Sequence, residues 1–171
     1  PDGSEQAVLD ITALTAELTK LDGQVSSFAV AGHFATRNPV HEKAVRDHLS
    51  QTTGLPVTCS HELSNALGGP RRALTTVLNA RLISLLDRLI KSTSLQIEQL
   101  GLNCALMVVK GDGTLLRADY ARNRPVETVL SGPAASISGA AFLVGEEDVI
   151  ISDIGGTTTD IARLRGGIVQ T

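Results

Sequence analysis

Aromatic side chains are scarce in this chain of 171 residues, which contains no tryptophan, one tyrosine and three phenylalanines. Proteins that bind single-stranded nucleic acid stack its bases on aromatic rings and track its phosphates with a basic groove. The formal net charge of −3 offers phosphates no basic surface of that kind. We therefore expect no nucleic-acid partner.

Cysteine is almost absent too, because Cys59 and Cys104 are the only two and they form no CxxC pair. A disulfide framework or a structural zinc site needs more cysteines at closer spacing. No hydrophobic run approaches the roughly 20 residues of a membrane helix. The N-terminus also lacks the basic and apolar segments of a signal peptide. We therefore expect a cytoplasmic protein with reduced thiols and no membrane segment.

The composition does support a packed core, since 42% of the residues are hydrophobic and 19% are charged. Sixteen glycines against six prolines indicate turns with a function rather than a low-complexity linker. The first residue is proline rather than methionine, and the last follows directly on a predicted strand. We therefore expect this chain to be an internal fragment of a longer protein.

The first sixty residues alternate between helical and strand-like patterns. Leucines at helical spacing predict a helix over 8–21, and Asn38-Pro39 predicts an N-cap and first residue for a helix over 40–49. Short apolar segments at 25–34 and 55–59 predict buried strands. Strands that alternate with helices favour parallel pairing, so the pattern predicts an α/β fold.

A longer helical pattern covers 71–100, either as one helix or as two with a break near residues 92–94, and Gly101 is suited to end it. Its apolar residues at steps of three and four predict one buried face. The residues of that predicted face are Leu74, Leu78, Leu82, Leu85, Leu86, Leu89 and Ile97.

The last seventy residues predict a strand at 105–109 that ends in a glycine turn at 111–113, and a helix at 134–143 with Ser131 as its N-cap. From Val149 to the end, apolar strands separated by glycine pairs predict an antiparallel meander. The expected sheet is therefore mixed, with flanking helices and a C-terminal antiparallel hairpin over 148–164.

The chemistry of the chain is concentrated at residues 153–161, which read DIGGTTTDI. Two glycines let the backbone turn sharply and expose N–H groups, and we expect at least one of them to have a positive φ. Three threonines add hydroxyls, which together with these N–H groups make a concave site suited to phosphate. A carboxylate at its edge is suited to order the Mg²⁺ that accompanies a nucleotide. The alternative is a plain hairpin with a Gly-Gly turn. The complete string favours phosphate, and neither a P-loop nor a GxGxxG motif competes with it.

At this point the chain resembles the hydantoinase A/5-oxoprolinase family, within the sugar kinase, Hsp70 and actin superfamily of ATPases. The hairpin string is common to the superfamily, and other segments narrow the resemblance to the family. They are RNPVHE at 37–42, SHEL at 60–63, LTTVLNA at 74–80 and LSGPAA at 130–135. The resemblance implies a ribonuclease H-like, actin-like architecture. It places the end of a first lobe at 1–66 and the start of a second, hydantoinase A-type lobe at 67–171.

The resemblance also implies an activity for the full-length protein, namely ATP-dependent opening of a cyclic amide such as a hydantoin or 5-oxoproline through phosphorylation of its carbonyl oxygen. ATP and Mg²⁺ are the implied cofactors, and a hydantoinase B-type subunit or domain is an implied partner. Asp153 is the expected catalytic and magnesium-ordering residue, with Asp160 as a second metal-binding carboxylate. The residues expected to hold phosphates are Gly155, Gly156, Thr157, Thr158 and Thr159.

Two alternatives stay open from the sequence. The parent protein is either an ATP-dependent ketone carboxylase subunit of the same wider family, or a nucleotide-binding regulatory lobe without ring-opening activity. Under every one of these hypotheses we expect the isolated fragment to be inactive, because it contains one phosphate hairpin and the reaction needs two lobes.

Other polar residues are weaker candidates for a site. His41 and His48 are seven residues apart on one predicted helix, too far to chelate one ion, so a surface pair is favoured. The pair His61-Glu62 follows a predicted strand end, where sites often form. The arginines 117, 122 and 124 favour a solvated loop.

Overall fold

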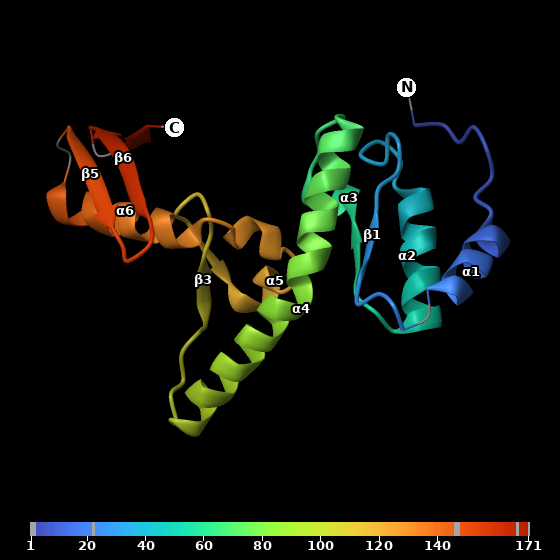
Figure 1. The fold of residues 1–171 in the computed structure, drawn as a ribbon, viewed down its shortest axis with the longest axis horizontal. Coiled ribbons are helices and arrows are strands. Elements are labelled where there is room, and N and C mark those ends of the chain that lie inside the picture. Colours follow the sequence, from blue (N-terminus) through green and yellow to red (C-terminus); the bar gives the residue numbers. More distant parts are fainter. Residues whose placement is uncertain (1–2, 22, 146–147, 167, 171) are drawn as a thin grey trace. The chain divides into compact units, whose positions relative to one another are not determined.

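The computed structural model describes residues 3–21, 23–145, 148–166 and 168–170, and it divides into two compact units, Pro1–Leu89 and Ile90–Thr171 (Figure 1). Each unit is described by itself. The elements that begin in the first unit are α1 (Ile11–Lys20), β1 (Phe28–Val30), α2 (Val40–Thr53), β2 (Val57–Cys59), α3 (Ser60–Leu63) and α4 (Gly69–Gln99).

The first unit is built around two parallel strands. β1 and β2 pair with Phe28 opposite Val57 and Val30 opposite Cys59, and α2 packs against both strands. This confirms the predicted order of helix, strand, helix and strand and the parallel pairing. The first strand is shorter than the predicted 25–34, because the chain turns into a loop in which Phe34 has a positive φ of 57°. The structure places Pro39 rather than Asn38 at the N-cap of α2 and begins the helix at Val40, although the Asn38 side-chain Oδ1 accepts the Val40 N–H at 3.2 Å.

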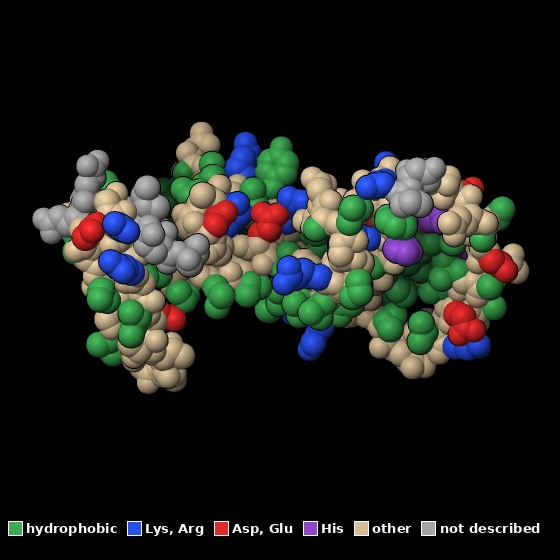
Figure 2. Space-filling model, turned by 90° about the horizontal axis from the view of Figure 1, so that it is seen from above, with side chains coloured by type: hydrophobic (Ala, Val, Ile, Leu, Met, Phe, Trp, Pro, Cys, Tyr) green, Lys and Arg blue, Asp and Glu red, His purple; other side chains and the backbone are tan. Residues whose placement is uncertain are grey.

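Helix α4 is continuous, with no break at residues 92–94, but its buried face is not the leucine face that the sequence predicts. Most of the predicted leucines are exposed, among them Leu74 at 61% and Leu85 at 59%, although Leu86 is buried. The buried residues in its first three turns are Arg72, Thr76, Asn79 and Ala80. These polar groups are buried because the first unit offers them hydrogen-bond partners. Hydrophobic side chains accordingly lie at the surface (Figure 2).

The second unit begins within α4, and Gly101 follows that helix with a φ of +67°, as its predicted role in ending the helix requires. The other elements of the second unit are β3 (Met107–Val109), β4 (Leu115–Arg117), α5 (Ala118–Ala121), the 3₁₀ helix η1 (Pro125–Thr128), α6 (Ser131–Val144), β5 (Val149–Ile154), β6 (Thr159–Arg165) and β7 (Ile168–Gln170). β3 and β4 form an antiparallel pair around the predicted glycine turn.

The start of α6 differs from the prediction. Ser131 is the first helical residue rather than the N-cap, and Leu130 occupies the cap position with a φ of 62° and no side-chain cap hydrogen bond. Leu130 has a left-handed conformation at the cap position, so Ser131 already belongs to the first turn of the helix and does not cap it.

The C-terminal strands form the predicted antiparallel meander, in the order β5-β6-β7. The described strands make three small sheets rather than one mixed sheet, because the parallel and the two antiparallel pairings share no strand. The helices and small sheets fit an α/β fold. The lobe boundary at residue 66 and the actin-like architecture stay predictions. Among the described residues, no helix combines the length and apolar character that crossing a bilayer requires.

Candidate functional site

The hairpin of β5 and β6 places the predicted phosphate-binding residues in a tight turn. The two strands pair from Val149 opposite Leu164 to Ile154 opposite Thr159, and the four residues 155–158 connect them. The Gly155 N–H donates to the Thr158 carbonyl oxygen at 2.9 Å and closes the turn. The turn residues are exposed, so their hydroxyls and the N–H groups other than that of Gly155 are accessible to a ligand.

The strand register brings two carboxylates together at the base of this turn. Asp153 and Asp160 are direct cross-strand partners, so their side chains lie on the same face of the ribbon. Side chains in such pairs have Cβ atoms about 4.5–5.5 Å apart, and like charges there are destabilising. Neither carboxylate has a hydrogen-bond or ion-pair partner among the residues that the structure describes. Two adjacent unpartnered carboxylates are an oxygen-rich, negative site suited to a hard cation such as Mg²⁺.

The glycines of the turn differ from our expectation that one of them has a positive φ. Neither Gly155 nor Gly156 has a left-handed φ, whereas Gly166 in the next turn does, at +56°. A Cβ built on Gly156 would meet no heavy atom within 4 Å, and one on Gly155 would lie 3.3 Å from the Thr158 carbonyl oxygen. The backbone conformation therefore does not require glycine at 156, and the space above that residue is open to a ligand.

We expect Gly156→Ala to change the free energy of unfolding by no more than about 0.5 kcal/mol, since the new Cβ meets open space at an ordinary φ. Gly113→Ala is the matched comparison. Gly113 has a φ of +81°, and a Cβ there would lie 2.5 Å from the Ser138 hydroxyl oxygen. That variant should lose about 1–3 kcal/mol. Urea unfolding of both variants checks the difference, and an equal loss would contradict the open turn at Gly156.

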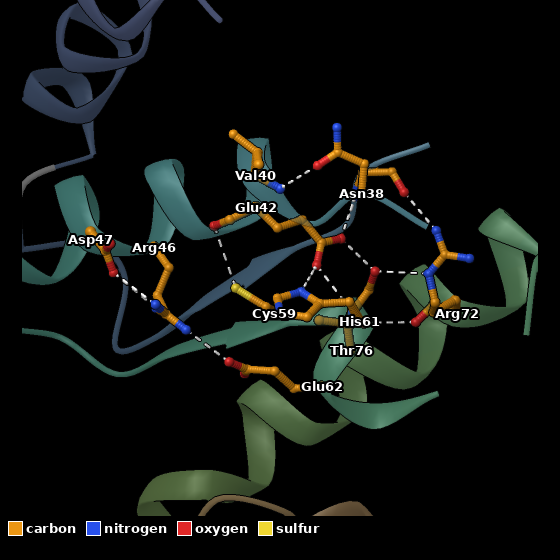
Figure 3. A network of polar contacts seen from close by, with 12 residues as sticks. Asn38, Val40, Glu42, Arg46, Asp47, Cys59, His61, Glu62, Arg72 and Thr76 are labelled. Atoms are coloured by element: carbon orange, nitrogen blue, oxygen red, sulfur yellow. Dashed lines mark hydrogen bonds and ion pairs between the residues drawn. The ribbon is translucent and has the colours of Figure 1, made fainter. Parts of the chain in front are cut away.

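A second group of polar residues lies in the first unit, where a buried glutamate ties the ends of both parallel strands together (Figure 3). The Glu42 side chain on α2 is 1% exposed. Its Oε1 accepts the Gly32 N–H, after β1, at 2.6 Å and the Ser60 hydroxyl, after β2, at 2.5 Å. Its Oε2 accepts the His61 N–H at 3.0 Å and bonds the His61 Nδ1 at 2.5 Å. One carboxylate therefore fixes two loops that are far apart in the sequence.

These hydrogen bonds keep the buried carboxylate ionised. Burial raises the pKa of Glu42, but the hydrogen bonds from Ser60, Gly32 and His61 together outweigh burial and hold the pKa below its ordinary value of 4.5. Because an ionised carboxylate can only accept, the Nδ1 of His61 carries the proton in this pair.

Arg72 on α4 is 2% exposed and is joined to the Glu42 carboxylate through the Ser60 hydroxyl. Its Nε donates to the Ser60 hydroxyl at 2.8 Å, so this hydroxyl accepts from the arginine and donates to Glu42. The other guanidinium nitrogens donate to the carbonyl oxygens of Ala66 at 2.8 Å and Gly32 at 2.6 Å. The arginine therefore joins α4 to the loops that Glu42 fixes.

With Cys59, this cluster has the residue types of a metal site, but the hydrogen bonds of its side chains do not fit metal binding. In the described part of the chain, Glu42, Cys59 and His61 have ligand atoms within 4.8 Å of one another. Burial, with the carboxylates of Glu62 and Glu42, raises the pKa of the Cys59 thiol to about 12. The thiol donates to the Glu42 carbonyl oxygen at 3.5 Å, and the Glu42 carboxylate is occupied by four donors. These residues therefore form a hydrogen-bonded network.

The sequence missed this network as a unit. His61 was expected near a site because it follows a strand end, whereas Glu42, Ser60 and Arg72 were not singled out. One signal in the sequence could have indicated the network. RNPVHE and SHEL each follow a predicted strand, and the first contains the carboxylate of Glu42 while the second contains the donors Ser60 and His61.

The weaker candidates have separate partners. His41 Nε2 lies 2.5 Å from Glu5 Oε1 and His48 Nε2 lies 2.9 Å from Thr15 Oγ1, so these histidines do not share a ligand. Arg117 ends strand β4 and pairs with Asp119 at 3.4 Å at the surface, whereas Arg122 and Arg124 are partly buried, so the three arginines do not form the solvated loop that we predicted.

Known proteins resemble this chain over nearly all of its length. A family model described as hydantoinase/oxoprolinase matches residues 72–171. Caprolactamase subunit alpha of Pseudomonas jessenii is 30% identical over 171 residues, which cover 97% of this chain and 25% of that protein. The acetophenone carboxylase gamma subunit of Aromatoleum aromaticum is 28% identical over 151 residues, covering 83% of this chain and 20% of that subunit.

Solved structures agree with the sequence matches. The crystal structure of the ATP-dependent caprolactamase from Pseudomonas jessenii superimposes with a TM-score of 0.82 at 30% identity, over 95% of this chain and 24% of that one. A nucleotide-free acetone carboxylase structure shares the fold, with a TM-score of 0.74 at 24% identity over 92% of this chain and 23% of that one. The chain thus spans about a quarter of the length of these relatives.

Proposed function

This chain belongs to the hydantoinase/oxoprolinase family, and from that premise we propose that its full-length protein uses ATP and Mg²⁺ to hydrolyse a cyclic amide. The observation that carries the proposal is the adjacent, unpartnered pair Asp153 and Asp160 at the base of an open glycine turn. Carboxylates bind magnesium, and turn N–H groups with threonine hydroxyls bind phosphate. The similarity to an ATP-dependent caprolactamase supports the choice of a cyclic amide.

In the proposed reaction, the amide carbonyl oxygen attacks the γ-phosphorus of ATP and ADP leaves. Water then adds to the activated carbonyl carbon and the carbon–nitrogen bond of the ring breaks, which leaves an acyl phosphate. A second water hydrolyses the acyl phosphate to the carboxylate and inorganic phosphate. The residues of this chain hold the nucleotide. The Gly156 N–H and the hydroxyls of residues 157–159 would bind phosphate oxygens, Gly155 closes the turn that presents them, and Asp153 and Asp160 would hold the magnesium ion.

A second candidate follows from a specific relative. The acetophenone carboxylase gamma subunit supports a ketone carboxylase role, in which ATP activates a different acceptor. A regulatory nucleotide-binding lobe is the third hypothesis. The relatives are named as alpha and gamma subunits, which supports a partner subunit, and we propose one of the hydantoinase B type.

The test is whether the full-length protein couples ATP hydrolysis to ring opening. We expect ADP release with Mg²⁺ to rise by about tenfold or more when ε-caprolactam, hydantoin or 5-oxoproline is added, with one ring-opened product per ADP. ADP release that responds only to a ketone with bicarbonate would favour the carboxylase. Release that responds to neither would favour the regulatory lobe.

A further inference from the structure

The first unit contains a cavity of about 380 Å³ that the nucleotide hypothesis does not use. Its walls are the segment 3–7, the loop 32–35 after β1 and the first turn of α2, from Val40 to Glu42. It therefore opens at the carboxyl end of β1, and the Glu42 network closes the same end of β2 (Figure 3). In α/β proteins ligands bind at the carboxyl ends of parallel strands. A volume of this size is sufficient for a small molecule.

The loop that lines the cavity is held in an unfavourable conformation. Phe34 has a φ of 57°, which is rare for a residue with a bulky side chain. Its carbonyl oxygen accepts the N–H groups of Arg37 at 2.8 Å and Asn38 at 3.1 Å, and its ring stacks on His33 with centroids 4.3 Å apart. Strain of this kind persists where surroundings impose it, and it concentrates at ligand sites.

The lining also selects a class of ligand. Among the described residues that line it there is no lysine or arginine, and the carboxylates are those of Glu5 and Glu42, so an anion such as phosphate is disfavoured. Glu42 is occupied by its four donors, and Glu5 pairs with His41. The ring nitrogens of His33 have no hydrogen-bond partner among the described residues. The same lining includes the apolar residues Phe34, Ala35 and Val40. Histidine and hydrophobic side chains also lie together at the surface of this unit (Figure 2).

We propose that this cavity binds the uncharged cyclic amide, with its ring against Phe34 and Val40 and its amide group bonded to the His33 imidazole. This assignment rests on the proposed function, because it names the part of the chain that holds the substrate. It gives the two units different tasks, with the neutral ring bound in the first and the nucleotide phosphates in the second.

The experiment compares two alanine-to-phenylalanine variants of the full-length protein. Ala7 lines the cavity, whereas Ala44 is an exposed residue of α2 that does not. Affinity for ε-caprolactam is measured by calorimetric titration, and affinity for ATP is measured in parallel. We expect Ala7→Phe to weaken lactam binding by about tenfold or more, because the new ring fills the space, and Ala44→Phe to leave it unchanged. ATP affinity should be unchanged in both variants.

His33→Ala provides a second variant, which removes an exposed side chain and should also weaken lactam binding about tenfold. Equal lactam affinity in the wild type, Ala7→Phe and His33→Ala would overturn the assignment, as would absence of lactam binding by the wild type. If the variants hydrolyse ATP in response to lactam with an unchanged KM for lactam, the assignment of the cavity is overturned. The proposed function is not contradicted by that result. Lactam binding that these variants weaken, without lactam-dependent ATP hydrolysis, would support the cavity and contradict the proposed function.

Discussion

Replacing Asp153 by asparagine in the full-length protein should lower cyclic-amide-dependent ATP turnover by about 100-fold or more. The amide has the shape of the carboxylate, but it lacks the charge that orders a magnesium ion beside the phosphates. Without Mg²⁺, the free energy of unfolding should not fall, because the substitution removes the repulsion between Asp153 and Asp160 across the strand pair. Turnover and stability should therefore change in opposite directions.

Ser152→Ala is the matched control, since Ser152 is the neighbouring residue of β5 and its side chain lies on the other face of the ribbon. Turnover of this control should stay within a few-fold of the wild type. Added Mg²⁺ should stabilise the wild type more than Asp153→Asn, because a ligand that binds the folded state stabilises it. A folded Asp153→Asn protein with near-normal turnover and an unchanged response to Mg²⁺ would rule out the metal role.

The hairpin could be predicted from the sequence because its determinants are local. An apolar strand, a Gly-Gly turn with two threonines and a return strand that begins at Thr159 lie within twenty residues, so short-range propensity determines both the turn and the register. The positive φ that we expected at Gly155 or Gly156 was wrong, since a four-residue turn can be closed without it. The same glycine pattern fits more than one turn geometry.

The buried face of α4 could not be predicted from periodicity, because periodicity records where apolar residues recur and not what lies opposite them. Arg72 and Asn79 are buried since Ser60 and Thr58, at or just after β2, accept their hydrogen bonds at 2.8 and 3.2 Å. These partners are 12 and 21 residues away in the sequence. Leu74, Leu78, Leu85 and Leu89 lie outside this face and are exposed on the described chain, which spans about a quarter of the length of its relatives.

Removing Glu42 should cause the largest loss of stability in the first unit. Glu42→Ala leaves the donors of Gly32, Ser60 and His61 without their acceptor. Each buried donor that loses its partner costs about 1–3 kcal/mol, so the total loss should be about 3–5 kcal/mol. Glu42→Gln keeps the shape and one oxygen, so it should cost less, about 1–3 kcal/mol, because its amide N–H groups meet donors. Urea unfolding at neutral pH checks the order of the two variants.

Glu62→Gln is the control for both variants, since the side chain of Glu62 is 42% exposed and pairs with Arg46 at the surface. It should change the free energy of unfolding by less than about 1 kcal/mol. A Glu42→Ala protein as stable as this control would show that the network contributes little to the fold.

The contribution of Glu42 should also depend on pH in a direction set by its pKa. That pKa is lower in the folded protein than its ordinary value of 4.5, so the folded state favours the ionised form. The stabilisation is therefore complete above about pH 5 and falls as the pH drops through 4.5 toward the folded-state pKa, where the carboxylate takes up a proton. The stability difference between the wild type and Glu42→Gln should be constant from pH 6 to 8 and shrink between pH 5 and 3. A difference that grows on acidification would mean that Glu42 is protonated in the folded protein, and would contradict the ionised carboxylate that accepts the four hydrogen bonds of the network.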